Sequence, residues 1–87
     1  MTEATLIRRV DPVYPAQARE KRLAGPVTVE ATIAENGSVR TVKVVSGTAL
    51  LADSAADAVR QWRYKPATLN GKAIEAQKQI TVVFKLP

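Results

Sequence analysis

An alanine-rich segment with helical spacing most constrains how this chain can fold. Its apolar residues recur every three or four positions, at Leu51, Ala55, Val59 and Trp62. That spacing predicts an amphipathic helix with one face in the core. The proline of Trp62-Arg63-Tyr64-Lys65-Pro66 ends the helical pattern. We therefore expect Trp62 to be a core residue rather than a stacking platform for a ligand.

Ahead of this helix the apolar period changes to two, which predicts a strand with one buried face. The residues of that face are Val27, Val29, Ala31 and Ile33. Asn36-Gly37 then supplies the positive φ angles of a tight hairpin. The returning strand, residues 39–46, does not keep its apolar residues at one parity, and this irregularity predicts a bulge or a less strictly one-sided strand. Ser46-Gly47-Thr48 offers oxygens that can cap the next helix.

Prolines shape the amino-terminal part of the chain. Pro12 and Pro15 hold the residues before them extended, so residues 8–14 are predicted to form an arm without helix. Pro15 suits the first turn of a short helix that runs through about Arg22. Gly25 is placed to end that helix.

The carboxyl-terminal segment is predicted to be extended from Ala73 onward, after a second turn signal at Asn70-Gly71. Its apolar face consists of Ile80, Val82, Phe84 and Leu86. A three-stranded antiparallel sheet with two helices packed on one face buries all these apolar stripes at once, so we predict an α+β fold. We assign residues 12–87 to the folded domain. Residues 1–11 are an N-terminal arm, or a remnant left where a longer chain was cut.

Composition argues against catalysis. The chain has no cysteine and no histidine, so thiol and imidazole groups are not available. Its eight acidic residues are scattered, without a pair placed to share a proton. The four glycines stand alone at turns and form no phosphate-binding loop. We therefore expect no enzyme activity, no cofactor and no metal.

The net charge of +5 is spread along the chain. The basic residues lie in separate groups, Arg8-Arg9, Lys21-Arg22 and Arg60, Arg63 and Lys65. That dispersion favours a solvated surface. A basic nucleic-acid-binding domain and a purely structural dimerisation domain stay open as alternatives. The first lacks the clustered basic stripe and exposed sheet aromatics that single-strand binders use.

The last strand is the segment best suited to bind a partner. A strand at the edge of a sheet exposes backbone donors and acceptors that can template another strand. Alternate residues of such a strand turn their amides toward the inner neighbour, and the residues between them turn theirs toward the open edge. The sequence leaves undecided which set is which. The same edge can pair with its own copy, which predicts a homodimer.

A series of motifs in fixed order resembles one known family, the C-terminal domains of TonB-type energy transducers. The motifs are Tyr14-Pro15, Gly25-Pro26-Val27, Asn36-Gly37, Val44-Val45-Ser46, Ala55-Ala56, Trp62-Arg63-Tyr64-Lys65-Pro66, Asn70-Gly71 and residues 80–86. The resemblance implies that a receptor segment, the TonB box, adds as a strand beside the last strand. The implied contacts there are Ile80, Thr81, Val82, Val83, Phe84, Lys85 and Leu86. A second implied contact is the arm, through Asp11, Pro12, Tyr14 and Pro15.

The same resemblance implies a place in the cell. It points to a periplasmic domain of an inner-membrane-anchored protein, with outer-membrane receptors as partners and no nucleic acid. An inner-membrane motor of the ExbB/ExbD type, driven by the proton gradient, would power uptake of substrates such as siderophores. No apolar run approaches the roughly 20 residues that cross a bilayer. The resemblance therefore implies that the chain is a fragment, cut at Met1-Thr2.

Overall fold

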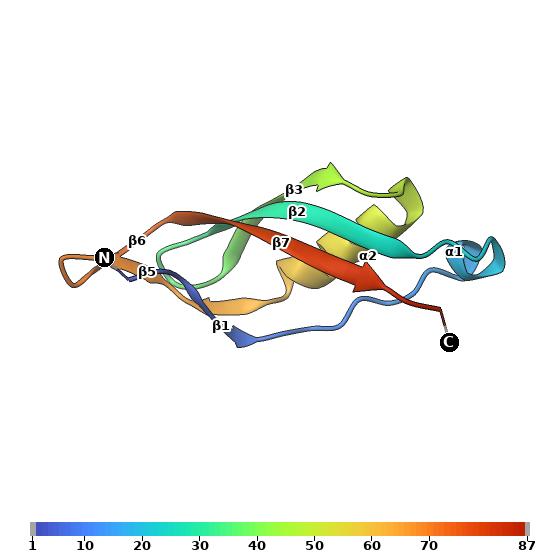
Figure 1. Ribbon diagram of the computed structural model, residues 1–87. Helices are drawn as coiled ribbons and strands as arrows, with labels where there is room; N and C mark the ends of the chain where they lie inside the picture. The colour runs from blue at the N-terminus through green and yellow to red at the C-terminus, as the bar shows by residue number, and fades with distance from the viewer. Residues whose placement is uncertain (1, 87) are drawn as a thin grey trace.

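A computed structural model describes residues 2–86 of the chain. Met1, half of the expected cut site, and Pro87 lie outside the described residues. The elements follow in the order β1 (Thr5–Arg8), α1 (Ala16–Glu20), β2 (Gly25–Ile33), β3 (Val39–Ser46), α2 (Ala49–Arg60), β4 (Arg63–Lys65), β5 (Ala67–Leu69), β6 (Lys72–Ile74) and β7 (Ala76–Phe84). They form an elongated molecule of 49 × 21 × 16 Å, with β2 and β7 along its length (Figure 1).

The main sheet has the strand order β3-β2-β7, and both pairings are antiparallel. Burial alternates along β2, where the odd-numbered residues 27–33 are fully buried. It alternates in the same way along the second half of β7, at Ile80, Val82 and Phe84. These two apolar stripes lie on one face because the strands pair in continuous register. The predicted α+β fold with a three-stranded antiparallel sheet is confirmed.

Strand β3 contains the irregularity that the sequence predicted. Its pairing with β2 shifts between Val39 and Thr41 and again between Val44 and Ser46, which makes Arg40 and Val45 the extra residues. Each extra residue reverses the parity of those that follow. Val39 and Val42 therefore reach the same half-buried face although they are three positions apart.

The two helices cover part of the buried face. Leu51, Ala55 and Val59 of α2 are buried, as their spacing predicted, and the helix packs against β2 and β3. Helix α1 packs on α2 and buries Ala18 completely. It is shorter than expected at both ends, because Pro15 is its N-cap and because Arg22, where the helix was expected to end, has a positive φ. Thr48 is the N-cap of α2, but its side chain makes no capping hydrogen bond.

The segment after α2 differs from the prediction. Trp62 is 5% exposed and lies in the core as expected, but the helix ends at Arg60. Residues 63–65 form strand β4, which pairs with β1 in a separate two-stranded ladder. The indole N–H of Trp62 donates to the carbonyl of Val10 at 2.8 Å. Pro66 also disfavours helix at the residue before it, so the chain turns into extended structure there.

The two Asn-Gly pairs make different turns. At the first, Gly37 alone has a positive φ, because the loop is a turn from Ala34 to Gly37 followed by a bulge. The expected pair of positive φ angles at Asn36-Gly37 is therefore wrong. A side chain at Gly37 would also collide with the Tyr64 carbonyl. At the second pair, Asn70 and Gly71 both have positive φ, and they join β5 to β6 in a hairpin.

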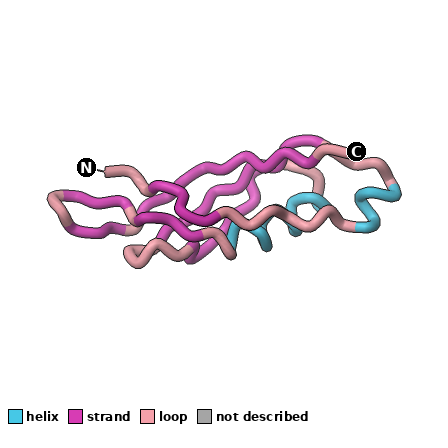
Figure 2. The backbone as a smooth tube through the Cα atoms, turned by 90° about the horizontal axis from the view of Figure 1, so that it is seen from below, coloured by secondary structure: helices cyan, strands magenta, loops and turns pink. Residues whose placement is uncertain are grey.

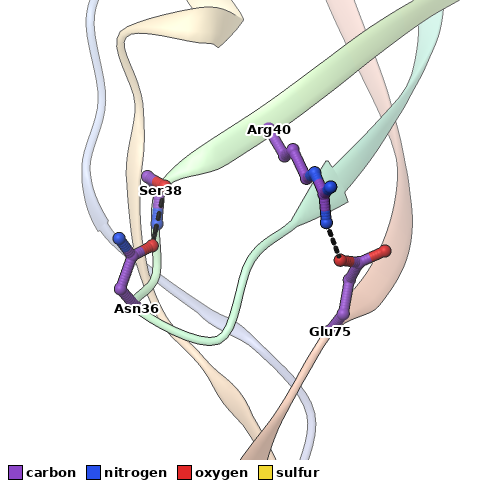
Figure 3. A network of polar contacts seen from close by, with 4 residues as sticks. All are labelled: Asn36, Ser38, Arg40 and Glu75. Carbon is purple, nitrogen blue, oxygen red and sulfur yellow. Dashed lines mark hydrogen bonds and ion pairs between the residues drawn. The ribbon is translucent and has the colours of Figure 1, made fainter.

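Polar contacts hold the first turn in place (Figure 3). The Asn36 carboxamide oxygen accepts hydrogen bonds from the Ser38 amide at 3.0 Å and from its hydroxyl at 2.7 Å. Arg40, the first of the two extra residues of β3, donates to Glu75 at 2.8 Å. This ion pair joins the start of β3 to the residue just before β7.

Candidate strand-addition edge

Strand β7 forms one edge of the main sheet. It pairs with β2 from Ala76 opposite Ile33 to Phe84 opposite Gly25, without a register shift. Within residues 2–86, no strand pairs with its other side. An uninterrupted, unpaired edge of this kind is a template for a further strand.

The direction of the edge amides follows from the pairing of β2. The N–H of Ala34 donates to the carbonyl of Ser38, on the β3 side of the sheet. Alternate residues of a strand turn their backbone groups the same way, so even-numbered residues of β2 face β3 and odd-numbered ones face β7. Pro26 fits this arrangement, since its missing N–H is not required by Val83 opposite it on β7.

A side-chain contact agrees with this assignment. The hydroxyls of Thr28 and Thr81 lie 3.2 Å apart, and they belong to residues directly opposite each other. Side chains come closest in the pairs that do not exchange backbone hydrogen bonds. We infer that the N–H and C=O groups of four residues point to the open edge, namely Gln77, Gln79, Thr81 and Val83. The question that the sequence left undecided is thus answered by the tertiary structure.

The residues predicted on β7 fall into two groups. Ile80, Val82 and Phe84 are buried and hold the strand on the core. Thr81 and Val83 are exposed on the outer face, and Val83 is 55% exposed. Lys85 and Leu86 follow the end of the strand at Phe84, so the strand expected over residues 80–86 was two residues too long.

The predicted arm residues lie in two places. The Tyr14 ring packs edge-on against Phe84, with ring centres 5.5 Å apart, and its hydroxyl donates to the Leu23 carbonyl. The structure therefore brings Tyr14 to the end of β7. Asp11 is exposed and pairs with Arg9 at 3.5 Å. It lines a hollow of about 550 Å³ between the arm and α2, as Pro15 does, away from β7. Pro12 is half-buried.

A slot at the start of β7 was not predicted from the sequence. It has a volume of about 320 Å³ and is lined by Glu3, Ala4, Ala67 and residues 76–79. Neighbouring residues of both parities line it, so it lies beside the edge of the strand rather than on one face. The Lys78 ammonium donates to the Ala4 carbonyl at 3.1 Å and lies 5.6 Å from the centre of the Tyr64 ring. No local pattern could have shown this slot, because its walls are far apart in the sequence.

Within residues 2–86, no three His, Cys, Asp or Glu side chains gather where they could hold a metal ion. Burial raises the pKa of the Tyr64 hydroxyl, which therefore stays protonated at neutral pH. No helix of the described chain is long and apolar enough to span a membrane.

These features define a small α+β domain with one open and regular sheet edge. The chain belongs to the family of Gram-negative bacterial TonB protein C-terminal domains, whose family model matches residues 10–86. The family assignment made from the motifs is confirmed.

Individual relatives agree with this assignment. Protein TonB of Vibrio cholerae is 32% identical over 85 residues, which are 95% of this chain and 35% of that protein. The chain thus spans about a third of the length of that relative. The TonB C-terminal domain of Pseudomonas aeruginosa, solved by NMR in solution, superimposes with a TM-score of 0.78 at 25% identity, over 99% of this chain and 89% of that one. The TonB2 protein of Vibrio anguillarum gives 0.68 at 33% identity, over 100% and 85%.

Proposed function

We propose that this chain is the periplasmic receptor-binding domain of a TonB-type energy transducer and that it holds the TonB box of outer-membrane receptors by strand addition to β7. The observation that carries the proposal is the unbroken pairing of β7 with β2 on one side and its lack of a strand partner, within residues 2–86, on the other. Family membership supports it.

In this proposal the backbone supplies the affinity. The outward N–H and C=O groups of Gln77, Gln79, Thr81 and Val83 form the ladder with the receptor segment. The buried side chains of Ile80, Val82 and Phe84 hold the strand straight while its outer edge is loaded. Lys85 and Leu86 extend the contact beyond the strand.

The arm has a supporting role in the same proposal. Tyr14 braces the end of β7 through Phe84, and Pro12 and Pro15 keep the chain extended on either side of Val13. Asp11 offers a carboxylate to a receptor segment that passes the arm. Residues 12–87 are then the receptor-binding domain, and residues 1–11 lead to it from the amino-terminal side.

The remaining steps of the proposal concern the whole transducer. An inner-membrane anchor and an ExbB/ExbD-type motor, driven by the proton gradient, pull on this domain, and the pull is passed to the receptor so that substrates such as siderophores enter. Because β7 runs along the length of the molecule (Figure 1), a pull in that direction loads the ladder along its whole length.

Single amide replacements test the proposal. N-methylation of Thr81 or Val83 removes an outward donor, so we expect at least about tenfold weaker binding of a TonB box peptide, with normal folding. N-methylation of Ile80 or Val82 removes a donor to β2, so we expect a lower melting temperature. Calorimetric titration against a panel of TonB box peptides and thermal melts measure the two effects. Binding that tolerates both outward replacements would contradict strand addition.

A further inference from the structure

The ladder of β1 and β4 brings together basic residues that are far apart in the sequence. Arg8 lies opposite Arg63, and Lys65 lies opposite Thr5. Arg8 and Arg63 belong to separate groups in the sequence, a pattern that predicted dispersed, solvated charges. Strands β1 and β4 lie side by side, and the arm that follows β1 runs on toward α1 (Figure 2).

The three basic side chains share one face of this ladder. Tyr64 between Arg63 and Lys65 is buried, so its two neighbours on β4 point away from the core. Arg8 lies opposite Arg63 and therefore on the same face. Two like charges in directly opposite positions destabilise a ladder. Among residues 2–86, no ion pair offsets this repulsion at Arg8, Arg63 or Lys65.

An apolar side chain stands among these charges. The register of the ladder shifts between Leu6 and Arg8, which makes Ile7 the extra residue. Ile7 is 68% exposed and Leu6 is 40% exposed. A run of acidic residues would match the charges, but it would leave Ile7 exposed to water. An anionic bilayer surface supplies both, because basic residues bind its headgroups while an apolar side chain enters the interface.

We propose that Ile7, Arg8, Arg63 and Lys65 form a basic patch that binds the surface of an anionic phospholipid bilayer. The patch points away from the main sheet, since the inward residue of its own ladder, Tyr64, points to the core. The inference does not depend on receptor binding.

Vesicle co-sedimentation tests the proposal. The probes are vesicles of phosphatidylglycerol and phosphatidylcholine in equal parts, and vesicles of phosphatidylcholine alone. We expect the wild-type chain to bind only the anionic vesicles. The double variant Arg8→Gln/Arg63→Gln should bind about 30-fold more weakly, from about 1 kcal/mol for each basic residue near the surface. Ile7→Asn should bind several-fold more weakly although its charge is unchanged.

A matched control has the same loss of charge elsewhere. Lys21→Gln/Arg22→Gln removes two exposed basic residues at the end of α1 and should bind like wild type. Equal loss in this control would show adsorption by net charge alone and would overturn the proposal, as would failure of the wild type to bind. Unchanged vesicle binding of Ile7→Asn would show that Ile7 does not enter the interface and would also overturn the proposal. Arg8→Gln/Arg63→Gln should melt close to wild type, because the repulsion that it removes offsets the lost hydrogen bond from Arg63 to the Trp62 carbonyl. This melting temperature separates lost binding from lost folding.

Discussion

The two edges of the main sheet are built differently. β3 has two extra residues, Arg40 and Val45, and its outer face carries Lys43. β7 pairs over its whole length without a shift. Bulges and charged residues are the devices by which natural edges avoid pairing with other chains. Val45 and Val83 are almost equally exposed, at 52% and 55%, so apolar exposure does not distinguish the two edges. Regular backbone geometry does, and only β7 has it.

The two edge strands also differ in the contacts that support them. Helix α2 packs under β3 and β2, and its contacts follow from its own periodicity. The far end of β7 is braced by the arm through the contact of Tyr14 with Phe84, while Trp62 holds the arm at Val10. The regular edge therefore depends on contacts between distant segments, and the blunted edge depends on a single helix.

Of the changes considered, removal of Trp62 should have the largest effect on the support of β7. Truncating a large buried aromatic residue costs about 3–5 kcal/mol of stability, so Trp62→Ala should melt far below wild type. The loss of hydrogen-exchange protection should be greater in β7 and the arm than in β3. Trp62→Phe, which keeps much of the packing, is the control. A melting temperature near that of wild type would show that the arm is not held by this residue.

The second largest effect is expected on self-association, in which the two edges should differ. We expect a weak homodimer that pairs β7 with its own copy, seen by light scattering over a concentration series. Val83→Lys should weaken it by at least about tenfold, because the dimer brings two added charges together. Binding of an uncharged peptide strand should change little. Val45→Lys on β3 is the matched control. An equal effect of that substitution would show that the dimer does not form through β7.

Tyr14 offers a smaller and more local test of the bracing. Tyr14→Phe keeps the ring against Phe84 but loses the hydrogen bond to Leu23, so we expect a loss of about 1 kcal/mol in denaturant unfolding. Amide exchange at the end of β7 should rise while that of β3 stays constant. Equal changes in both strands would mean that Tyr14 stabilises the fold as a whole.

The smallest effect is expected at the contact between the two edges. Arg40 and Glu75 are an exposed pair, and such pairs contribute about 0.2–1 kcal/mol. Arg40→Gln should therefore shift the melting temperature slightly, and salt should reduce the difference. A larger, salt-independent loss would show that Arg40 also holds the bulge of β3 in place.

Local patterns in the sequence determined the elements that carry their own periodicity. The spacing of Leu51, Ala55 and Val59 predicted α2, and alternation predicted β2 and the second half of β7. The broken parity of residues 39–46 predicted that β3 is irregular. The motif series led to the family. These signals are readable because each face is buried along one continuous segment.

Tertiary structure alone decided the features that involve distant partners. Strands β1, β4, β5 and β6 have three or four residues each, too few for a periodic signal, and β1 and β4 exist by pairing across most of the chain. That pairing gathers the basic patch. The direction of the β7 amides depends on which side β2 occupies, and the slot at Lys78 depends on where Ala4 lies. A sequence records which residues are apolar, but it does not record which remote segments meet.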